Sequence, residues 1–168
     1  MSEKEQRTAD VIVIGAGILG TFHAYFAAQK GLKVLLLERY ALPIEASTRN
    51  FGMVVQTIVE TDSSWSAYAL KTRETYQHIQ RQHDITVRQH GSLYLASTES
   101  ERLVLLEFYQ RFASTTDCLY LDATEACARY PFVLAMTCTG ALLFPNDLMI
   151  EPRLLFVSLF HTSLRRIL

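Results

Sequence analysis

The sequence predicts an α/β fold in which a βαβ nucleotide-binding lobe is followed by the start of an α+β lobe. Three observations support this prediction. A β-branched run at residues 10–14 is followed, within about 30 residues, by a helical pattern and a second apolar run, which is the length of a βαβ unit. A glycine-rich turn joins the first run to the helical pattern. Beyond about residue 84 the predicted elements become shorter and mixed, as in an α+β lobe.

The first three elements follow from short local patterns. Residues 10–14 are predicted to form a fully buried strand, and residues 32–38 a second one. Between them, residues 18–30 follow a helical pattern that Gly31 ends as a C-terminal cap. A crossover of this kind is nearly always right-handed.

A longer helix is predicted after an irregular stretch from residue 40 to residue 60. The segment Asp62-Ser63-Ser64 is typical of a helix N-terminus, and the pattern then runs to about His83. The stripe on this helix is more typical of a core than of a cofactor contact. Its members are Trp65, Ala69, Thr72, Tyr76 and Ile79.

Two capping boxes mark the helices of the second lobe. Thr98 with Glu101 predicts a helix that continues to about residue 113, and Asp122 with Glu125 predicts a short helix that Pro131 stops. Three apolar runs are typical of strands, at residues 92–96, 118–121 and 141–144.

Composition and charge are those of a globular chain. Of the 168 residues, 49% are hydrophobic and 20% charged, and the net charge is −1. These values exclude a disordered chain, and the lack of a basic cluster disfavours a nucleic-acid partner. The uncharged apolar runs are shorter than the ~20 residues that cross a bilayer, so no membrane span is expected. The charged opening MSEKEQRTAD lacks the apolar core of a signal peptide, which predicts a cytoplasmic protein.

The cysteines and histidines give no disulfide or metal pattern. Cys118, Cys127 and Cys138 are odd in number and form no CxxC pair, so free thiols are expected. The five histidines lack metal-ligand spacing, and no metal site is predicted.

The turn between the first strand and the first helix has the spacing of a dinucleotide-binding fingerprint. Gly15 permits the tight turn, Gly17 lets the backbone approach a diphosphate, and Gly20 lets the helix pack close to the sheet. The free N–H groups near Ile18 and Leu19 lie at the positive end of the helix dipole, which favours phosphate oxygens.

Glu38 ends the second strand, 18 positions after Gly20. An acid near this spacing accepts hydrogen bonds from two ribose hydroxyls in dinucleotide-binding folds. Its charge also repels a 2′-phosphate, so an adenosine ribose without that phosphate is expected.

The stretch ADVIVIGAGILGTFHA, with VLLLER after it, resembles the FAD-binding start of the D-amino-acid-oxidase-like flavoprotein family. That family includes glycine, sarcosine and D-amino-acid oxidases. The resemblance implies a Rossmann-like FAD-binding lobe followed by the start of a substrate lobe, with FAD as the cofactor. Relatives that tether the flavin do so through a His or Cys, whereas this chain has Arg49-Asn50 in the second loop, so non-covalent FAD is expected.

The second loop after the βαβ unit touches the flavin in that family, and ASTRNFGM is its counterpart here. The side chains of Ser47, Thr48 and Asn50 suit the diphosphate and the ribityl chain. Arg49 offsets phosphate charge, and Gly52 lets the backbone pass close to the ring. Thirteen residues are therefore expected to bind the cofactor: Gly15, Ala16, Gly17, Ile18, Leu19, Gly20, Glu38, Arg39, Ser47, Thr48, Arg49, Asn50 and Gly52.

The resemblance continues along nearly the whole chain. YLDATEACARYP is similar to a helix-and-proline stretch of the family's substrate domain, and GALLFPNDLMIEPR to its strand–turn–DPR element, with Glu151 where Asp is usual. STRNFGMV is similar to the loop of a subgroup linked to phosphonate catabolism. The implied segments are an FAD-binding segment (9–60), a connecting helix (61–83), a partial substrate domain (84–150) and a C-terminal helix or aberrant tail (151–168).

The implied reaction is oxidation of a C–N bond in a small amine or amino acid, and an aminophosphonate is one such substrate. A hydride passes from the carbon that bears the amine to the flavin, and the imine hydrolyses in water. The residues themselves identify no catalytic group. Chains of this family are considerably longer, so a truncated and inactive polypeptide is expected. Two alternatives stay open, which are an NAD-dependent dehydrogenase fragment and a non-catalytic truncated remnant.

Overall fold

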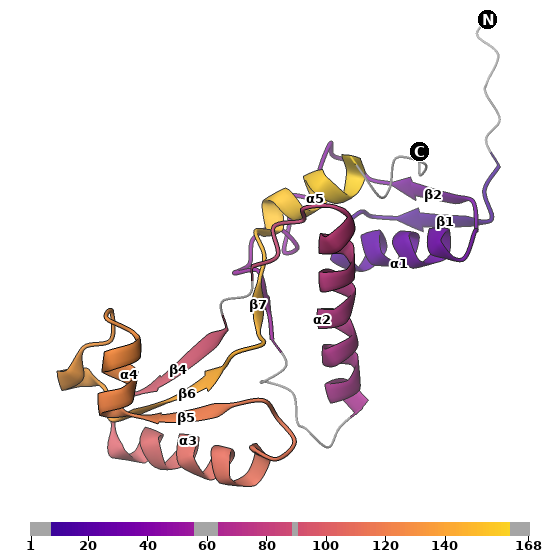
Figure 1. Cartoon of the computed structure of the whole chain (residues 1–168). Coiled ribbons are helices and arrows are strands. Elements are labelled where there is room, and N and C mark those ends of the chain that lie inside the picture. Colours follow the sequence, from indigo (N-terminus) through magenta and orange to yellow (C-terminus); the bar gives the residue numbers. More distant parts are fainter. Residues whose placement is uncertain (1–7, 56–63, 89–90, 162–168) are drawn as a thin grey trace, which may run out of the picture. The chain divides into compact units, whose positions relative to one another are not determined.

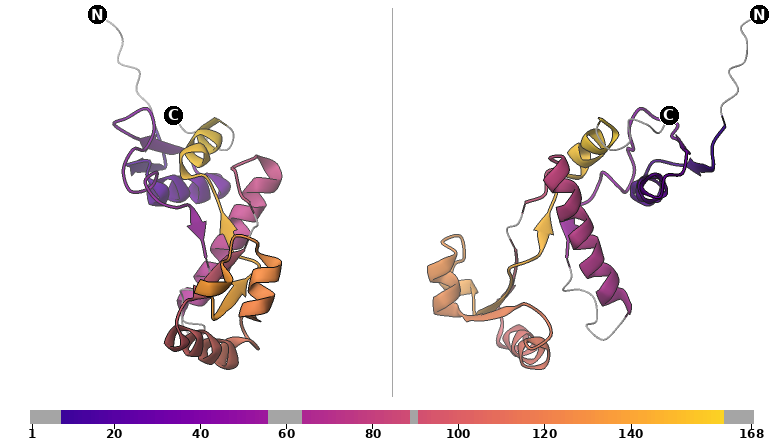
Figure 2. Two further views of the ribbon diagram at one scale, coloured as in Figure 1. Left: turned by 90° about the vertical axis from the view of Figure 1, so that its left-hand side faces the viewer. Right: turned by 45° about the vertical axis from the view of Figure 1, so that its right-hand side comes forward.

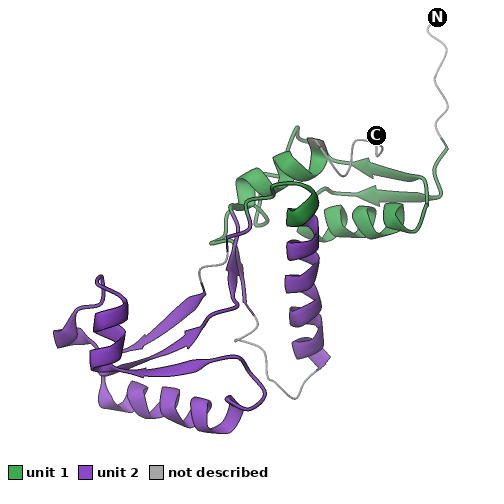
Figure 3. Cartoon of the chain, in the orientation of Figure 1, with its two compact units in different colours: residues 1–52, 80–86, 151–168 green, residues 53–79, 87–150 purple. Residues whose placement is uncertain are grey.

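The computed structural model describes residues 8–55, 64–88 and 91–161. The chain divides into two compact units, coloured separately in Figure 3. The first unit comprises residues 1–52, 80–86 and 151–168, and the second comprises residues 53–79 and 87–150.

The first unit begins with the predicted βαβ arrangement, formed by β1 (Val11–Ile14), α1 (Ile18–Gln29) and β2 (Val34–Leu37) (Figure 1). The two strands pair in parallel, from Val11 opposite Val34 to Ile14 opposite Leu37. The helix α1 lies against both strands, as the two views in Figure 2 show. All three predicted elements are confirmed, with ends that shift by at most two residues.

Within the described residues, one face of this small sheet is covered and the other is open. Side chains alternate along β1, and Ile12 and Ile14 are 60% and 85% exposed on the face away from α1. The expectation of a fully buried strand is therefore wrong for the described residues, because a two-stranded sheet with one covering helix leaves its other face open.

The helix α5 (Pro152–His161) also belongs to the first unit. Pro152 stands at its first position, where the missing N–H costs nothing because no helical acceptor precedes it. Leu155, Phe156 and Leu159 recur at helical spacing and are almost fully buried. A helix far along the chain thus contributes buried side chains to the first unit.

The second unit is built on an antiparallel sheet with the strand order β4-β6-β5 (Figure 1). Its strands are β4 (Ser92–Ala96), β5 (Leu119–Asp122) and β6 (Gly140–Phe144). The helices beside this sheet are α3 (Glu99–Phe112), α4 (Ala123–Arg129) and the short 3₁₀ helix η1 (Ala135–Thr137), and residues 64–79 of the longer helix α2 (Ser64–Gln82) also belong to this unit. The strands predicted at 92–96, 118–121 and 141–144 are confirmed to within one residue.

The central strand β6 is buried along its whole length because a helix covers each face of the sheet. Ala141 and Leu143 join the cluster that α4 covers, whereas Leu142 and Phe144 join the cluster that α3 covers. This alternation follows from the two-residue period of a strand. A strand that is buried on both faces of a sheet requires a continuous apolar run, and GALLF is such a run.

The helix α2 (Ser64–Gln82) matches its predicted range, but its stripe is buried only near the C-terminal end. Tyr76 and Ile79 are 6% and 0% exposed, whereas Trp65 is 69% exposed. The assignment of Trp65 to a core is therefore wrong, because the first turns of α2 remain open to solvent. Asp62 and Ser63 of the predicted cap lie outside the described residues.

Two very short strands were not predicted. β3 (Met53–Val54) pairs in an antiparallel manner with β7 (Leu148–Met149). Two residues are too few to show a strand period, so the pattern could not indicate this pairing. In the part of the chain that the structure describes, no helix combines the length and the apolar character needed to cross a bilayer.

Candidate functional site

The glycine-rich turn between β1 and α1 has a backbone that only glycine accommodates at its two ends. Gly15 has a φ of +94°, in the left-handed region that side chains disfavour. A Cβ placed on Gly20 would lie 1.9 Å from the carbonyl oxygen of Gly15, well inside van der Waals contact. The backbone N–H of Gly15 donates to the Leu37 carbonyl oxygen at 2.7 Å, which fixes the turn to the end of β2.

Ala16, between Gly15 and Gly17, is held through both its backbone N–H and its carbonyl group. Its N–H donates to Glu38 Oε2 at 2.8 Å, and its carbonyl accepts from the buried Thr21 hydroxyl at 2.8 Å. The residue is only 1% exposed. These contacts fix the turn before any ligand binds.

Glu38 places its carboxylate beside this turn and makes three backbone hydrogen bonds. Besides the contact with Ala16, its Oε1 accepts from the N–H groups of Arg39 at 2.9 Å and Tyr40 at 3.3 Å. The Ala16 N–H is the main cause that lowers the pKa of this carboxyl, and the neighbouring backbone bonds and Arg39 add to it. Glu38 is therefore ionised at neutral pH.

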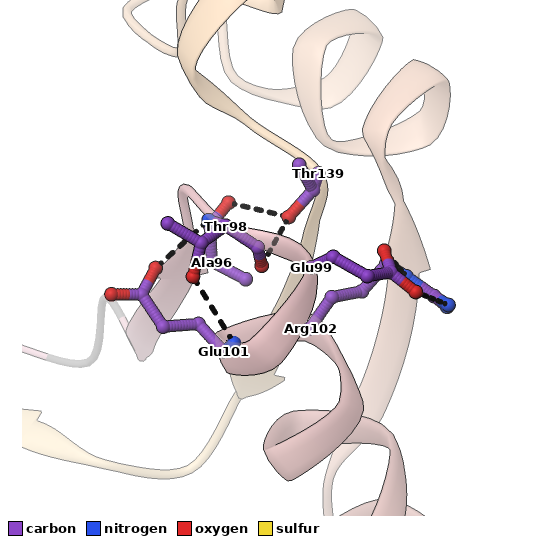
Figure 4. Close-up of polar contacts among 6 residues, drawn as sticks. All are labelled: Ala96, Thr98, Glu99, Glu101, Arg102 and Thr139. Carbon is purple, nitrogen blue, oxygen red and sulfur yellow. Dashed lines mark hydrogen bonds and ion pairs between the residues drawn. The ribbon is translucent and has the colours of Figure 1, made fainter.

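The N-terminus of α1 differs from those of α3 and α4. Both of the latter carry the predicted capping boxes, which are confirmed, and both have acidic residues in the first turn. Figure 4 shows how Thr98 and Glu101 close the start of α3. The N-cap of α1 is Gly17, which has no side chain to cap it, and its first turn holds no acid.

Ser47, in the second loop, provides the side-chain cap that α1 lacks at its own N-cap residue. Its Oγ accepts the backbone N–H of Ile18 at 2.9 Å, from 29 positions along the chain. A Cβ on Gly17 would lie 3.1 Å from the same oxygen, so the glycine makes room for this contact. The second loop is thereby placed against the positive end of the helix dipole.

A cavity of about 490 Å³ opens over this turn. The structure brings five of the predicted cofactor residues together on its wall, which are Gly15, Gly17, Glu38, Arg39 and Ser47. The remaining lining residues come from the strand ends and from the segment after β2: Ile14, Leu37, Tyr40, Pro43, Ile44 and Glu45.

The segment from Tyr40 to Glu45 was not among the predicted site residues. Tyr40 stacks under the Arg39 guanidinium, 5.0 Å from the ring centroid, and Pro43 is buried. The signal that identifies the segment is its position, because ligands of open parallel sheets bind beyond the carboxyl ends of the strands.

The other predicted residues do not line this cavity. Thr48 and Arg49 line a second, neighbouring hollow. The Asn50 amide donates to the carbonyl oxygens of Ala46 and Ser47, both at 3.0 Å, and accepts from the N–H of Gly52, whose φ is +69°. Asn50 and Gly52 therefore shape the loop. Leu19 is 76% exposed on α1.

The site fits a dinucleotide on its own geometry. A wall of glycine backbone leaves space that side chains would fill, the adjacent helix N-terminus carries no acid, and an ionised carboxylate stands at the end of the second strand. Diphosphate and ribose hydroxyls are the groups that these features bind. Among the described residues, no three His, Cys, Asp or Glu side chains gather as metal ligands would.

Comparison with known proteins places this geometry among flavoproteins. The family model described as DAO, FAD dependent oxidoreductase, matches residues 10–166. Glycine oxidase from Geobacillus kaustophilus superposes with a TM-score of 0.84 at 23% identity, over 94% of this chain and 45% of that one. L-α-glycerophosphate oxidase from Mycoplasma pneumoniae with FAD bound gives 0.79 at 20% identity, over 96% and 44%.

Among curated proteins, one of the subunits of the anaerobic glycerol-3-phosphate dehydrogenase from Escherichia coli K12 is 37% identical over 54 residues, which are 32% of this chain and 10% of that protein. The chain thus spans less than half the length of the solved relatives and a tenth of this curated one.

Proposed function

The chain belongs to the FAD-dependent oxidoreductase family, and from this premise we propose that the protein oxidises a C–N bond of a small amine or amino acid. The family makes FAD the cofactor and oxidoreduction the class of chemistry. The single observation that carries the proposal is the cavity over the glycine-rich turn, where Glu38 and Ser47 meet the start of α1.

We assign the diphosphate to the backbone of Gly15 and Gly17 and to the start of α1, where no acidic side chain of the helix competes. We assign the Ser47 hydroxyl to the same group, because it already lies at this helix end. Each carboxylate oxygen has more than one lone pair, so Glu38 has acceptor capacity left for ribose hydroxyls while it holds Ala16.

Bound FAD supplies an acceptor for a hydride from the carbon that bears the amine, and the imine product hydrolyses in water. The work of this chain is to hold and orient the cofactor. We propose that the binding is non-covalent, since the described residues that line the cavity and the adjoining hollow include no His or Cys.

The substrate class is proposed from two kinds of support. Glycine oxidase and iminodiacetate oxidase, to which the chain is similar in fold, are named for small amines. An aminophosphonate is the finer proposal, and it depends on the STRNFGMV loop. We propose the FAD lobe within residues 9–60, the connecting helix within 61–83 and part of the substrate lobe within 84–150.

We propose that turnover requires a chain of the relatives' length, because these 168 residues span only 45% of glycine oxidase. The first test is therefore cofactor binding. Calorimetric titration with FAD is expected to show binding that the same titrations with FMN and NAD do not reproduce. FMN lacks the adenosine ribose that Glu38 is proposed to hold, and tighter NAD binding would favour a dehydrogenase.

The matched variants for this titration are E38A and E107A. Glu107 is an exposed carboxylate on α3, so E107A controls for the change in net charge. E38A is expected to weaken FAD binding at least tenfold, and E107A to leave it unchanged. Equal affinities for FAD in the two variants would refute the assigned site. Assays with 2-aminoethylphosphonate and glycine, read as H₂O₂ or dye reduction, then test the substrate class.

A further inference from the structure

A second hollow of about 330 Å³ adjoins the cofactor cavity. The two share Pro43 and Ile44 on their walls. The polar residues of the hollow are Thr48 and Arg49 from the second loop and Arg153 from the first turn of α5. All of them belong to the first compact unit, so the hollow is a feature of that unit by itself.

The two arginines bring positive charge to this hollow, and no acidic side chain is among its described lining residues. Among the described residues, neither guanidinium makes an ion pair or a side-chain hydrogen bond; the contacts of both residues run through their backbone N–H groups. The nearest acid in sequence, Glu151, uses its Oε1 to accept the backbone N–H of Arg153 at 3.2 Å. The Thr48 hydroxyl donates to the Glu45 carbonyl, so it is already engaged.

The position of Arg153 adds a second, independent argument. It stands in the first turn of α5, where the helix dipole favours anions and disfavours a cation. The first turn of α5 contains no acid, and Glu151, which precedes the helix, directs its Oε1 to the backbone N–H of Arg153. An arginine at this end of a helix is stabilised when an anion lies beside it, because the guanidinium and the helix then attract the same charge.

We propose that Arg49 and Arg153 form a subsite for a phosphoryl or phosphonate dianion. A guanidinium binds such a group through two parallel hydrogen bonds, and two guanidinium groups balance its double charge. The inference rests on the proposed function, which it deepens by giving the anionic end of the substrate a place.

Two sources can supply this dianion, the substrate and the diphosphate of FAD. The geometry favours the substrate, because the glycine-rich turn and the start of α1 already account for the diphosphate in the other cavity. Methylphosphonate represents the substrate's anionic end without its amine, and ADP represents the cofactor's diphosphate without its flavin. Neither probe requires turnover or bound FAD.

The experiment measures binding of methylphosphonate and of ADP to the full chain by calorimetry. The variants are R49Q and R153Q, with R111Q, an exposed arginine of α3, as the matched control. R49Q and R153Q are each expected to weaken methylphosphonate binding about tenfold, the loss of one charge-assisted contact. R111Q is expected to change nothing, and ADP binding is expected to be equal in all three.

Each other outcome has a defined meaning. If R49Q and R153Q weaken ADP binding as much as methylphosphonate binding, and the two ligands compete, the hollow holds the cofactor's diphosphate. If the unsubstituted chain does not bind methylphosphonate, or if neither variant differs from R111Q, the subsite is refuted. Circular dichroism checks that each variant folds. A negative result with methylphosphonate leaves the FAD titration unaffected, so the subsite and the proposed function are tested separately.

Discussion

The hydroxyl oxygen of Ser47 lies 2.9 Å from the backbone nitrogen of Ile18, although 29 positions separate the two residues. The helix α1 thus receives its side-chain cap from the loop after β2, not from its own N-cap residue, Gly17. A loop that caps this helix is held at the same place where a diphosphate is expected, which couples the shape of the second loop to the cofactor site.

Replacing Ser47 tests this coupling. S47A removes the acceptor for the Ile18 N–H and is expected to lower the free energy of unfolding by about 0.5–2 kcal/mol, the range for loss of a helix N-cap. S47T keeps a hydroxyl and is expected to retain most of this energy. Urea denaturation followed by circular dichroism measures both. A difference of less than about 0.3 kcal/mol between S47A and S47T, roughly half the smallest expected loss, would show that the contact does not stabilise α1.

Protonation of Glu38 at acid pH is expected to weaken its hydrogen bond with the Ala16 N–H and so to destabilise the glycine-rich turn. Its pKa is lowered in the folded chain, mainly by the Ala16 N–H, and lies near about 4.3 in an unfolded one. The stability that ionised Glu38 contributes is therefore present above its pKa in the unfolded chain. It is lost as the pH falls through its pKa in the folded chain. FAD affinity is expected to decline in the same window.

The E38Q variant isolates this carboxylate from the other acids of the chain. Thermal midpoints of the two proteins, measured from pH 7 to pH 3, are expected to differ most at pH 7 and to converge as Glu38 becomes protonated. A constant difference across the range would mean that the charge of Glu38 does not hold the turn.

Gly20 and Gly17 are expected to respond very differently to alanine. In G20A the new Cβ would meet the Gly15 carbonyl at 1.9 Å, so backbone must move, and a loss of about 3 kcal/mol or more is expected. In G17A the nearest atom is the Ser47 side-chain oxygen at 3.1 Å, which can turn away at the cost of its contact with Ile18, so the loss is expected to be that of the cap, about 0.5–2 kcal/mol. Urea midpoints that were equal for the two variants would contradict the close packing of α1 on β1.

The sequence predicted those parts of the fold whose causes are local. The spacing of Gly15, Gly17 and Gly20 determines a turn within six residues, and the pair of Asp122 and Glu125 determines a helix start within four. Burial was predicted less well. Ile14 and Trp65 are apolar at positions that a pattern assigns to a core, yet no described segment covers them.

The candidate site could be predicted only in part, because only some of its contacts have local causes in the sequence. Glu38 could be found because its distance from the glycines along the chain is characteristic of the motif. The contact between Ser47 and Ile18, and the meeting of Arg49 with Arg153 across more than 100 positions, depend on tertiary packing that no local pattern encodes. Asn50 was predicted as a ligand from its amide, whereas that amide is engaged in the loop's own hydrogen bonds.

The start of α3 provides a last prediction, one that leaves the cofactor site unchanged. Thr98 Oγ1 accepts the N–H of Glu101, and the Thr139 hydroxyl donates to the carbonyls of Ala96 and Thr98, which ties this helix start to the segment before β6 (Figure 4). T98A removes the cap and is expected to lower the free energy of unfolding by about 1 kcal/mol, while T98S keeps it. FAD affinity is expected to be the same in both variants, because Thr98 lies in the second compact unit and the cofactor cavity in the first. A loss of FAD binding in T98A at a temperature where the variant remains folded would show that the two units are energetically coupled.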